Sequence, residues 1–177
     1  MAIVSQEKKR MLAPAIKAVL KKYKMKASIA VRHNSTLVVN IKEGALDILE
    51  CVNMRALNDT RNYDLENNTF DMELQAQRLG GHYVTVSPYW IEENYAHNPV
   101  VVSFLTELKS AMEGEDFFCH DDIQSDYFFR SHYTDINVGS YNKPYICPTA
   151  RDFTPEIEML RERAKKLNEE QKLTAAA

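Results

Sequence analysis

Apolar residues recur along this chain with two periods, one of about 3.6 residues and one of two. The longer period places apolar side chains on one face of a helix. It predicts helices over residues 5–24, 45–57, 71–79, 98–113 and 154–173. The shorter period, in segments rich in β-branched and aromatic residues, is typical of strands. It predicts a β-hairpin over residues 29–41 and further strands over residues 83–89 and 127–141.

Residues that begin, end or interrupt these elements refine the prediction. Ser5 can cap the first helix, but Pro14 has no amide hydrogen, so this helix is kinked at Pro14 or begins near it. Pro99 and Gly114 mark the start and the end of the fourth helix, and Asn34 can adopt the positive φ of a hairpin turn. We therefore predict an α+β fold. It consists of a small, mainly antiparallel sheet of about four strands, including the N-terminal hairpin, with helices packed on one face and a charged C-terminal helix.

The chain has the size and composition of one globular domain. Its 177 residues contain no internal repeat, Ser/Gly-rich linker or low-complexity segment. We predict a single domain over residues 1–177, in which 154–173 form the C-terminal helix and 174–177 a frayed tail. No apolar run approaches the roughly 18 residues of a membrane helix, and the N-terminus lacks the features of a signal peptide. We expect a cytoplasmic protein with no membrane partner. The widely spaced Cys51, Cys119 and Cys147 fit reduced thiols.

Charge is segregated along the chain, although its net value is only -3. Residues 1–26 contain eight lysines and arginines against one acid, whereas residues 91–126 contain nine acids against one lysine. Such asymmetry can steer partners of opposite charge. The alternative is a solvated basic helix face and an acidic surface loop.

The residues of catalytic and metal sites concentrate between residues 115 and 135. Cys119, His120 and the neighbouring acids, with His132 and Asp135 downstream, include every ligand type of a zinc or magnesium site. Their spacing matches no standard metal motif. Cys119 and His120 are adjacent, so their side chains point to opposite faces if the chain is extended there, which disfavours a nucleophile and base pair. We therefore predict a binding protein without catalytic residues, bound metal or cofactor, and keep a metal-dependent enzyme as a less favoured alternative.

The acidic middle of the chain is the first candidate for a binding surface. Carboxylates on a rigid surface can take the positions of DNA phosphates and compete for a basic channel, and aromatic rings can anchor such an interface. The alternative is that the aromatic residues form core and the acids only aid solubility. The candidate partner-binding residues are Glu107, Glu113, Glu115, Asp116, Phe117, Asp121, Asp122, Asp126 and Tyr127.

The basic first helix is the second candidate. Lysine side chains can neutralise backbone phosphates, which supply most of the affinity in nucleic-acid binding. This alternative makes the chain a nucleic-acid-binding accessory domain. Its candidate residues are Lys17, Lys21, Lys22 and Lys24.

Two segments carry a resemblance to a known group of domains. Residues 122–128 (DIQSDYF) and 132–145 (HYTDINVGSYNKPY) resemble the C-terminal part of the large polyvalent protein associated domains of bacteriophages and conjugative elements. The first helix and residues 27–32 (ASIAVR) are similar to the start of these domains. The resemblance implies a non-enzymatic phage or mobile-element accessory protein that binds a host protein or nucleoprotein complex in the host cytoplasm. It points to an inhibitor of a defence system of the CRISPR or restriction type. The charged C-terminal helix packs either on its own domain or on a second copy.

Overall fold

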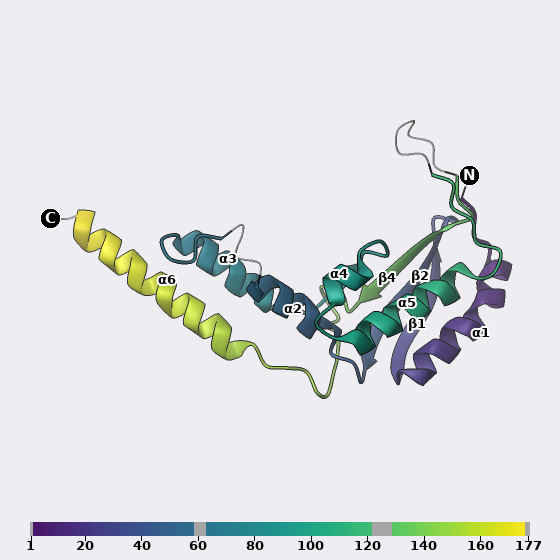
Figure 1. The fold of residues 1–177 in the computed structure, drawn as a ribbon, viewed down its shortest axis with the longest axis horizontal. Coiled ribbons are helices and arrows are strands. Elements are labelled where there is room, and N and C mark those ends of the chain that lie inside the picture. Colours follow the sequence, from purple (N-terminus) through teal and green to yellow (C-terminus); the bar gives the residue numbers. More distant parts are fainter. Residues whose placement is uncertain (1, 59–62, 122–128, 176–177) are drawn as a thin grey trace.

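The computed structural model describes residues 2–58, 63–121 and 129–175. It contains a four-stranded mixed sheet in the order β1-β2-β4-β3. The labelled strands β1, β2 and β4 lie toward one end of the molecule in Figure 1. The antiparallel β1–β2 hairpin pairs in parallel with β4, and β3 pairs antiparallel with the other edge of β4. The predicted α+β class and N-terminal hairpin are therefore confirmed. The strands are β1 (Met25–Arg32), β2 (Thr36–Gly44), β3 (Val84–Val86) and β4 (Tyr133–Val138).

Six helices accompany the sheet in the described part of the chain. They are α1 (Gln6–Lys22), α2 (Ile48–Asn58), α3 (Thr69–Leu79), α4 (Ile91–Tyr95), α5 (Pro99–Glu113) and α6 (Thr154–Ala175). Five of them match the predicted helices in position, and α6 reaches Ala175, beyond the predicted end at residue 173. The short α4 is not among the predicted helices, because its single turn has too few residues to display a helical period.

Local signals in the sequence explain several boundaries. The Ser5 side chain accepts a hydrogen bond from the Lys8 amide at 3.0 Å, so α1 begins at Gln6 and Pro14 lies inside it. His33 and Asn34 both have positive φ, 53° and 52°, in the three-residue loop 33–35 that joins β1 to β2. Gly114 ends α5 with φ 74°.

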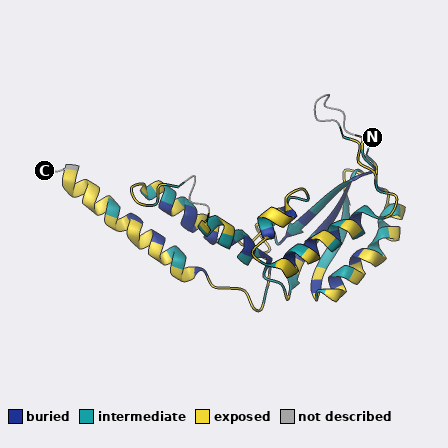
Figure 2. Ribbon diagram, viewed as in Figure 1, coloured by how far each residue is buried: buried dark blue, intermediate teal, exposed yellow. Residues whose placement is uncertain are grey.

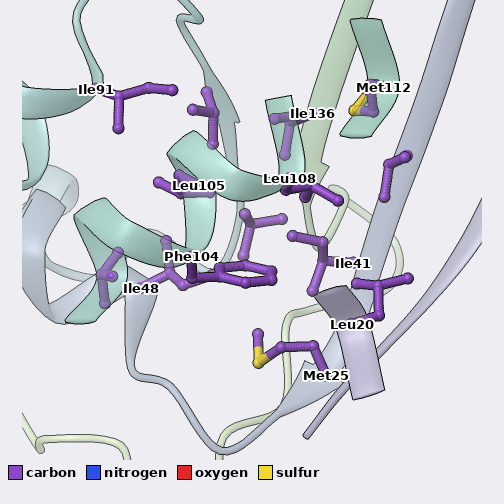
Figure 3. Packing of buried hydrophobic residues seen from close by; sticks show 14 of the residues in the cluster. Leu20, Met25, Ile41, Ile48, Ile91, Phe104, Leu105, Leu108, Met112 and Ile136 are labelled. Carbon is purple, nitrogen blue, oxygen red and sulfur yellow. The ribbon is translucent and has the colours of Figure 1, made fainter. Parts of the chain in front are cut away.

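The main core lies between one face of the sheet and the helices α1, α2, α4 and α5. Leu37, Val39 and Ile41 of β2 point into it, where Phe104 and Leu108 of α5 are fully buried. Figure 3 shows Ile41 packed near Phe104 and Leu108. The opposite face of the sheet carries several polar side chains. There the Asn137 side chain donates to Asn40 at 3.1 Å and accepts from Thr85 at 3.0 Å. The helices of this core therefore pack on one face of the sheet, as predicted.

A second, smaller core joins α3 to α6, which lie side by side away from the sheet (Figure 1). Ala76 and Leu79 of α3 pack with Phe153 and Leu160, and side chains from the end of α2 join this cluster. Beyond Ala164, most residues of α6 are exposed (Figure 2). No helix in the described residues combines the length and the apolar character needed to cross a membrane.

Candidate functional site

A short two-stranded ribbon connects the end of α5 to the start of β4. It consists of residues 117–121 and 129–132, which we call the aromatic ribbon, and it pairs antiparallel around Cys119 and Arg130. The His120 amide donates to the Phe129 carbonyl at 2.7 Å, and the Ser131 amide donates to the Phe118 carbonyl at 3.0 Å. Because side chains alternate along extended chains, the ribbon has two different faces.

The outer face of the aromatic ribbon carries a stack of three rings from Phe118, His120 and Phe129. The Phe118 ring centroid lies 5.0 Å from that of Phe129 and 6.0 Å from that of His120, and the His120 and Phe129 rings are nearly parallel at 6.4 Å. Phe118 and Phe129 remain 37% and 39% exposed. These large side chains therefore leave substantial apolar area in water, which is the kind of area that protein partners bury.

The inner face of the aromatic ribbon packs toward the sheet. Phe117 meets His132 edge to face, with 5.3 Å between ring centroids. Cys119 lies on this face beside a pocket, whereas His120 belongs to the outer stack. The expectation that Cys119 and His120 point to opposite faces therefore agrees with the structure. The structure also separates the Phe117–Phe118 pair, since Phe117, the predicted contact residue, packs inward and Phe118 is the exposed ring.

Arg130 organises the inner face. Its guanidinium forms an ion pair with Asp121, donates to the Tyr89 hydroxyl at 2.9 Å, and lies 4.8 Å from the ring centroid of Tyr133. The Asp121 and Arg130 side chains are only 10% and 13% exposed. The sequence predicts Asp121 as part of an acidic surface, but its charge is compensated within the chain.

His132 links the ribbon to α5 and is fully buried. Its Nε2 lies 3.0 Å from the carbonyl oxygen of Met112, and its Nδ1 lies 3.1 Å from the Ser131 hydroxyl. Burial lowers the pKa of His132. A neutral ring satisfies both contacts if Nε2–H donates to the carbonyl and Nδ1 accepts from Ser131. Both nitrogens then have structural partners, which fits a buried scaffold residue.

Glu107 joins the acidic and the basic charge clusters, which the sequence presents as alternative binding sites. Both of its carboxylate oxygens accept from the Lys22 ammonium, at 2.7 and 2.8 Å, and one accepts from the Tyr23 hydroxyl at 2.8 Å. The hydrogen bond from Lys22 lowers the pKa of Glu107, and the same bond raises the pKa of Lys22. Glu107 and Lys22 thus link α5 to α1, and their charges offset each other.

The other predicted residues have different surroundings. Glu115 and Asp116 are exposed immediately after α5, and Glu113 is half-buried beside Lys109. Lys17, Lys21 and Lys24 are exposed on or just after α1. The predicted contacts Asp122, Asp126 and Tyr127 lie outside the described residues.

Sequence reasoning missed the exposed outer stack and the role of Arg130. The alternation of residues 117–121 would have separated Phe118 and His120 from Phe117 and Cys119, because a strand shows every second side chain on one face. The pairing of this segment with residues 129–132, which places Phe129 in the stack, has no comparable local signal.

The remaining findings concern metal ligands and known proteins. Within residues 2–58, 63–121 and 129–175, no three His, Cys, Asp or Glu side chains gather in a way that could hold a metal ion. Comparison of the chain with protein families, with curated proteins and with solved structures gave no match.

Proposed function

We propose that this chain is a non-enzymatic binding protein that docks on a basic protein surface through the outer face of the aromatic ribbon. The exposed stack of Phe118, His120 and Phe129 carries this proposal. Aromatic side chains are enriched at the centres of protein interfaces, where their burial supplies much of the binding energy. Glu115 and Asp116 are exposed in the adjoining segment, so positive charge on the partner would complement this region.

The ion pairs of two predicted acids limit how much the acidic residues can contribute to partner binding. Glu107 and Asp121 have cationic partners within the chain, so they contribute little net negative charge to a phosphate-like array. The proposal therefore assigns most of the affinity to the aromatic rings, and assigns orientation and association rate to Glu115 and Asp116. The partner that we propose, on the resemblance alone, is a host nucleic-acid-directed defence complex of the CRISPR or restriction type.

A matched pair of variants tests the docking surface. The chain carrying Phe118→Ser and Phe129→Ser is compared with wild type and with Tyr141→Ser, which alters an exposed ring outside the aromatic ribbon. A partner captured from host lysate by wild type should be lost with the double variant and retained with Tyr141→Ser. The purified partner should bind the wild-type chain with an affinity that falls as the salt concentration rises. Equal capture by all three chains, or loss with Tyr141→Ser alone, contradicts the proposal.

The inhibitor role needs its own assay. Increasing amounts of the chain are added to a purified defence complex while cleavage of target DNA is followed. We expect wild type to slow cleavage and the double ribbon variant to have little effect. Inhibition that persists in the double variant would exclude this surface, and a captured partner without any nucleic-acid-directed activity would exclude the defence role.

A basic stripe on α1 supports nucleic-acid binding as a second candidate. Lys17 and Lys21 are exposed and lie four residues apart on α1, so they share one face of the helix, whereas the exposed Lys24 follows the end of α1 with a φ of 55°. Lys22 is engaged by Glu107 instead. If this stripe binds phosphates, Lys17→Glu with Lys21→Glu should abolish salt-sensitive binding of fluorescent single strands or duplexes. Binding that is unchanged in this variant would rule the stripe out.

A further inference from the structure

Glu113 stands where a carboxylate is disfavoured in two ways. It is the last residue of α5, and the carbonyl end of a helix carries partial negative charge. Its side chain is only 23% exposed, and this burial raises the pKa of the carboxyl group. Lys109, one turn earlier, has its ammonium 3.9 Å from the Glu113 carboxylate, too far for a hydrogen bond, and offsets the effect only in part. Positions that break a folding rule in this way concentrate at functional sites.

A pocket of about 300 Å³ lies beside this carboxylate. Pro88 and Tyr89 form one wall, and Lys109 and Glu113 of α5 form a second. The inner face of the aromatic ribbon and the first residues of β4 complete it. Four separate segments therefore enclose the space, so its shape depends on the fold rather than on one loop.

The backbone of β4 contributes to the pocket beyond the end of its ladder with β3. The amides of Tyr133 and Gly139 donate to residues of the β2 side, so alternate residues of β4 face β3 instead. The ladder with β3 pairs Val138 and Ile136 and then ends. Thr134 is the next residue in this series and lines the pocket. Its backbone groups consequently point toward the β3 side, where the register places Pro88, which has no amide hydrogen to donate.

Charge decides which ligand fits. Arg130 and Asp121 compensate each other, and Asp135 forms an ion pair with Arg32. Among the charged residues of the described pocket wall, only Glu113 and Lys109 have no closer partner than each other. Of these two, Glu113 is the more buried, and its position at the carbonyl end of α5 makes a positive ligand favourable.

The aromatic wall also suits a cation. The guanidinium of Arg130 already lies over the Tyr133 ring in this pocket, and the rings of Tyr89 and Phe117 line it as well. A cation near aromatic faces gains from the ring quadrupole, most of all where water is partly excluded.

We propose that this pocket receives a single lysine or arginine side chain of an extended peptide segment, with Glu113 as its counter-ion and the Thr134 backbone as its hydrogen-bonding partner. The inference rests on the proposed function, because the peptide segment is assumed to belong to the basic partner protein. It adds the class of anchor residue and the place where the anchor inserts.

Small probes test the pocket without the partner. The full-length chain is titrated with Nα-acetyl-L-arginine amide and, separately, with the citrulline analogue, which has nearly the same shape and no charge. Amide resonances near Glu113 and Thr134 are followed by NMR. The arginine probe should shift them saturably, and the citrulline probe should bind at least about fivefold more weakly. Equal affinity for both probes, or no binding of the arginine probe, overturns the proposal.

Two variants of similar shape show whether the pocket prefers a positive or a negative ligand. Glu113→Gln keeps the shape and should weaken arginine binding about fivefold or more, whereas Lys109→Met removes the competing cation and should preserve or tighten it. Nα-acetyl-L-aspartate amide reports the opposite polarity. If that anion binds, and Lys109→Met abolishes its binding while Glu113→Gln strengthens it, the pocket is an anion site and the inference is wrong. If the chain binds the arginine probe but captures no partner from host lysate, the pocket assignment stands and the proposed function is rejected.

Discussion

The imidazole Nε2 of His132 lies 3.0 Å from the carbonyl oxygen of Met112, in the last turn of α5. Carbonyls at the end of a helix have no partner within it, so this contact caps α5 and fixes the start of β4 against it. Because both residues are fully buried, the cap is protected from water. The segment that carries the aromatic ribbon is therefore anchored at its base.

This cap predicts that stability falls in mild acid. Burial lowers the pKa of His132 in the folded chain, whereas the unfolded chain titrates near the ordinary value of about 6.5. Below that value the unfolded state binds more protons, so the free energy of unfolding declines as the pH falls from about 6.5 toward the folded pKa. Urea unfolding at about pH 7.5 and about pH 5.5 measures the decline.

The variant His132→Gln separates the contribution of His132 to the pH dependence of stability from that of other titratable groups. The variant should lose about 1–3 kcal/mol at neutral pH, because the Met112 carbonyl and the Ser131 hydroxyl lose well-placed partners. Its unfolding free energy should also depend less on pH over the same interval. A variant with the full wild-type pH dependence would show that another group is responsible.

Glu113→Gln should stabilise the fold. The substitution removes a half-buried charge from the carbonyl end of α5, which is worth roughly 0.3–1 kcal/mol for a helix terminus. The raised pKa of Glu113 sets the sign, since the folded chain holds its proton more tightly than the unfolded chain. The gain is therefore absent below the ordinary pKa of about 4.5 and grows as the pH rises through the folded value. Glu115→Gln, on an exposed side chain, is the control and should change little. Destabilisation by Glu113→Gln would contradict the energetic argument.

Gly139→Ala should destabilise the chain by more than about 1 kcal/mol. Gly139 has φ 66°, and a Cβ atom there would lie 2.6 Å from the amide nitrogen of Tyr145 and 2.8 Å from the carbonyl oxygen of His82. Gly80→Ala provides the matched control, because φ of Gly80 is -85° and a Cβ atom there would lie 3.6 Å from the nearest atom, the carbonyl oxygen of Gln77. Thermal or urea unfolding should place Gly80→Ala at or slightly above wild type. Similar losses in both variants would argue against the steric explanation.

Leu160→Ala should loosen α6 from α3. Leu160 is buried in the second core, and truncation of a buried leucine costs about 2–4 kcal/mol where a cavity remains. Hydrogen exchange should accelerate in α3 and α6 more than in the sheet. Leu173→Ala, on a side chain that is 73% exposed, should leave exchange nearly unchanged. Uniform acceleration across the sheet would instead show that the small core has no separate stability.

Two acids of the predicted acidic surface should differ in their effect on partner binding. Asp116→Asn removes an exposed charge and should slow association with a basic partner, an effect that added salt diminishes. The double variant Lys22→Met with Glu107→Gln removes an ion pair without changing the net charge and should have little effect. Association rates measured by biolayer interferometry compare the two. A larger effect of the double variant would show that Glu107 or Lys22 contacts the partner.

Most helices could be predicted because their signals are local. Pro99 and Gly114 bound α5 within its own sequence, and the positive φ of Asn34 follows from the preferences of a hairpin turn. The parallel pairing of β2 with β4 is not local. It joins residues such as Val39 and Ile136 across the whole succession of α2 to α5, and no turn residue records that pairing.

The sequence predicts the region of the candidate site but not which of its residues are exposed and uncompensated. Acids and aromatics do concentrate after α5, but charge compensation depends on distant partners, such as Lys22 for Glu107. Similarly, Tyr89 reaches Arg130 from a different part of the chain. A count of charges along the sequence cannot show which of them the fold neutralises.

The helix α2 belongs to both cores. Ile48 and Cys51 in its first half are buried against the sheet, whereas Met54, Ala56 and Leu57 pack against the cluster of α3 and α6. Bending between the two parts would have to distort this continuous helix. A force applied to the far end of α6 should therefore be transmitted through α3 and α2 to the edge of the main core.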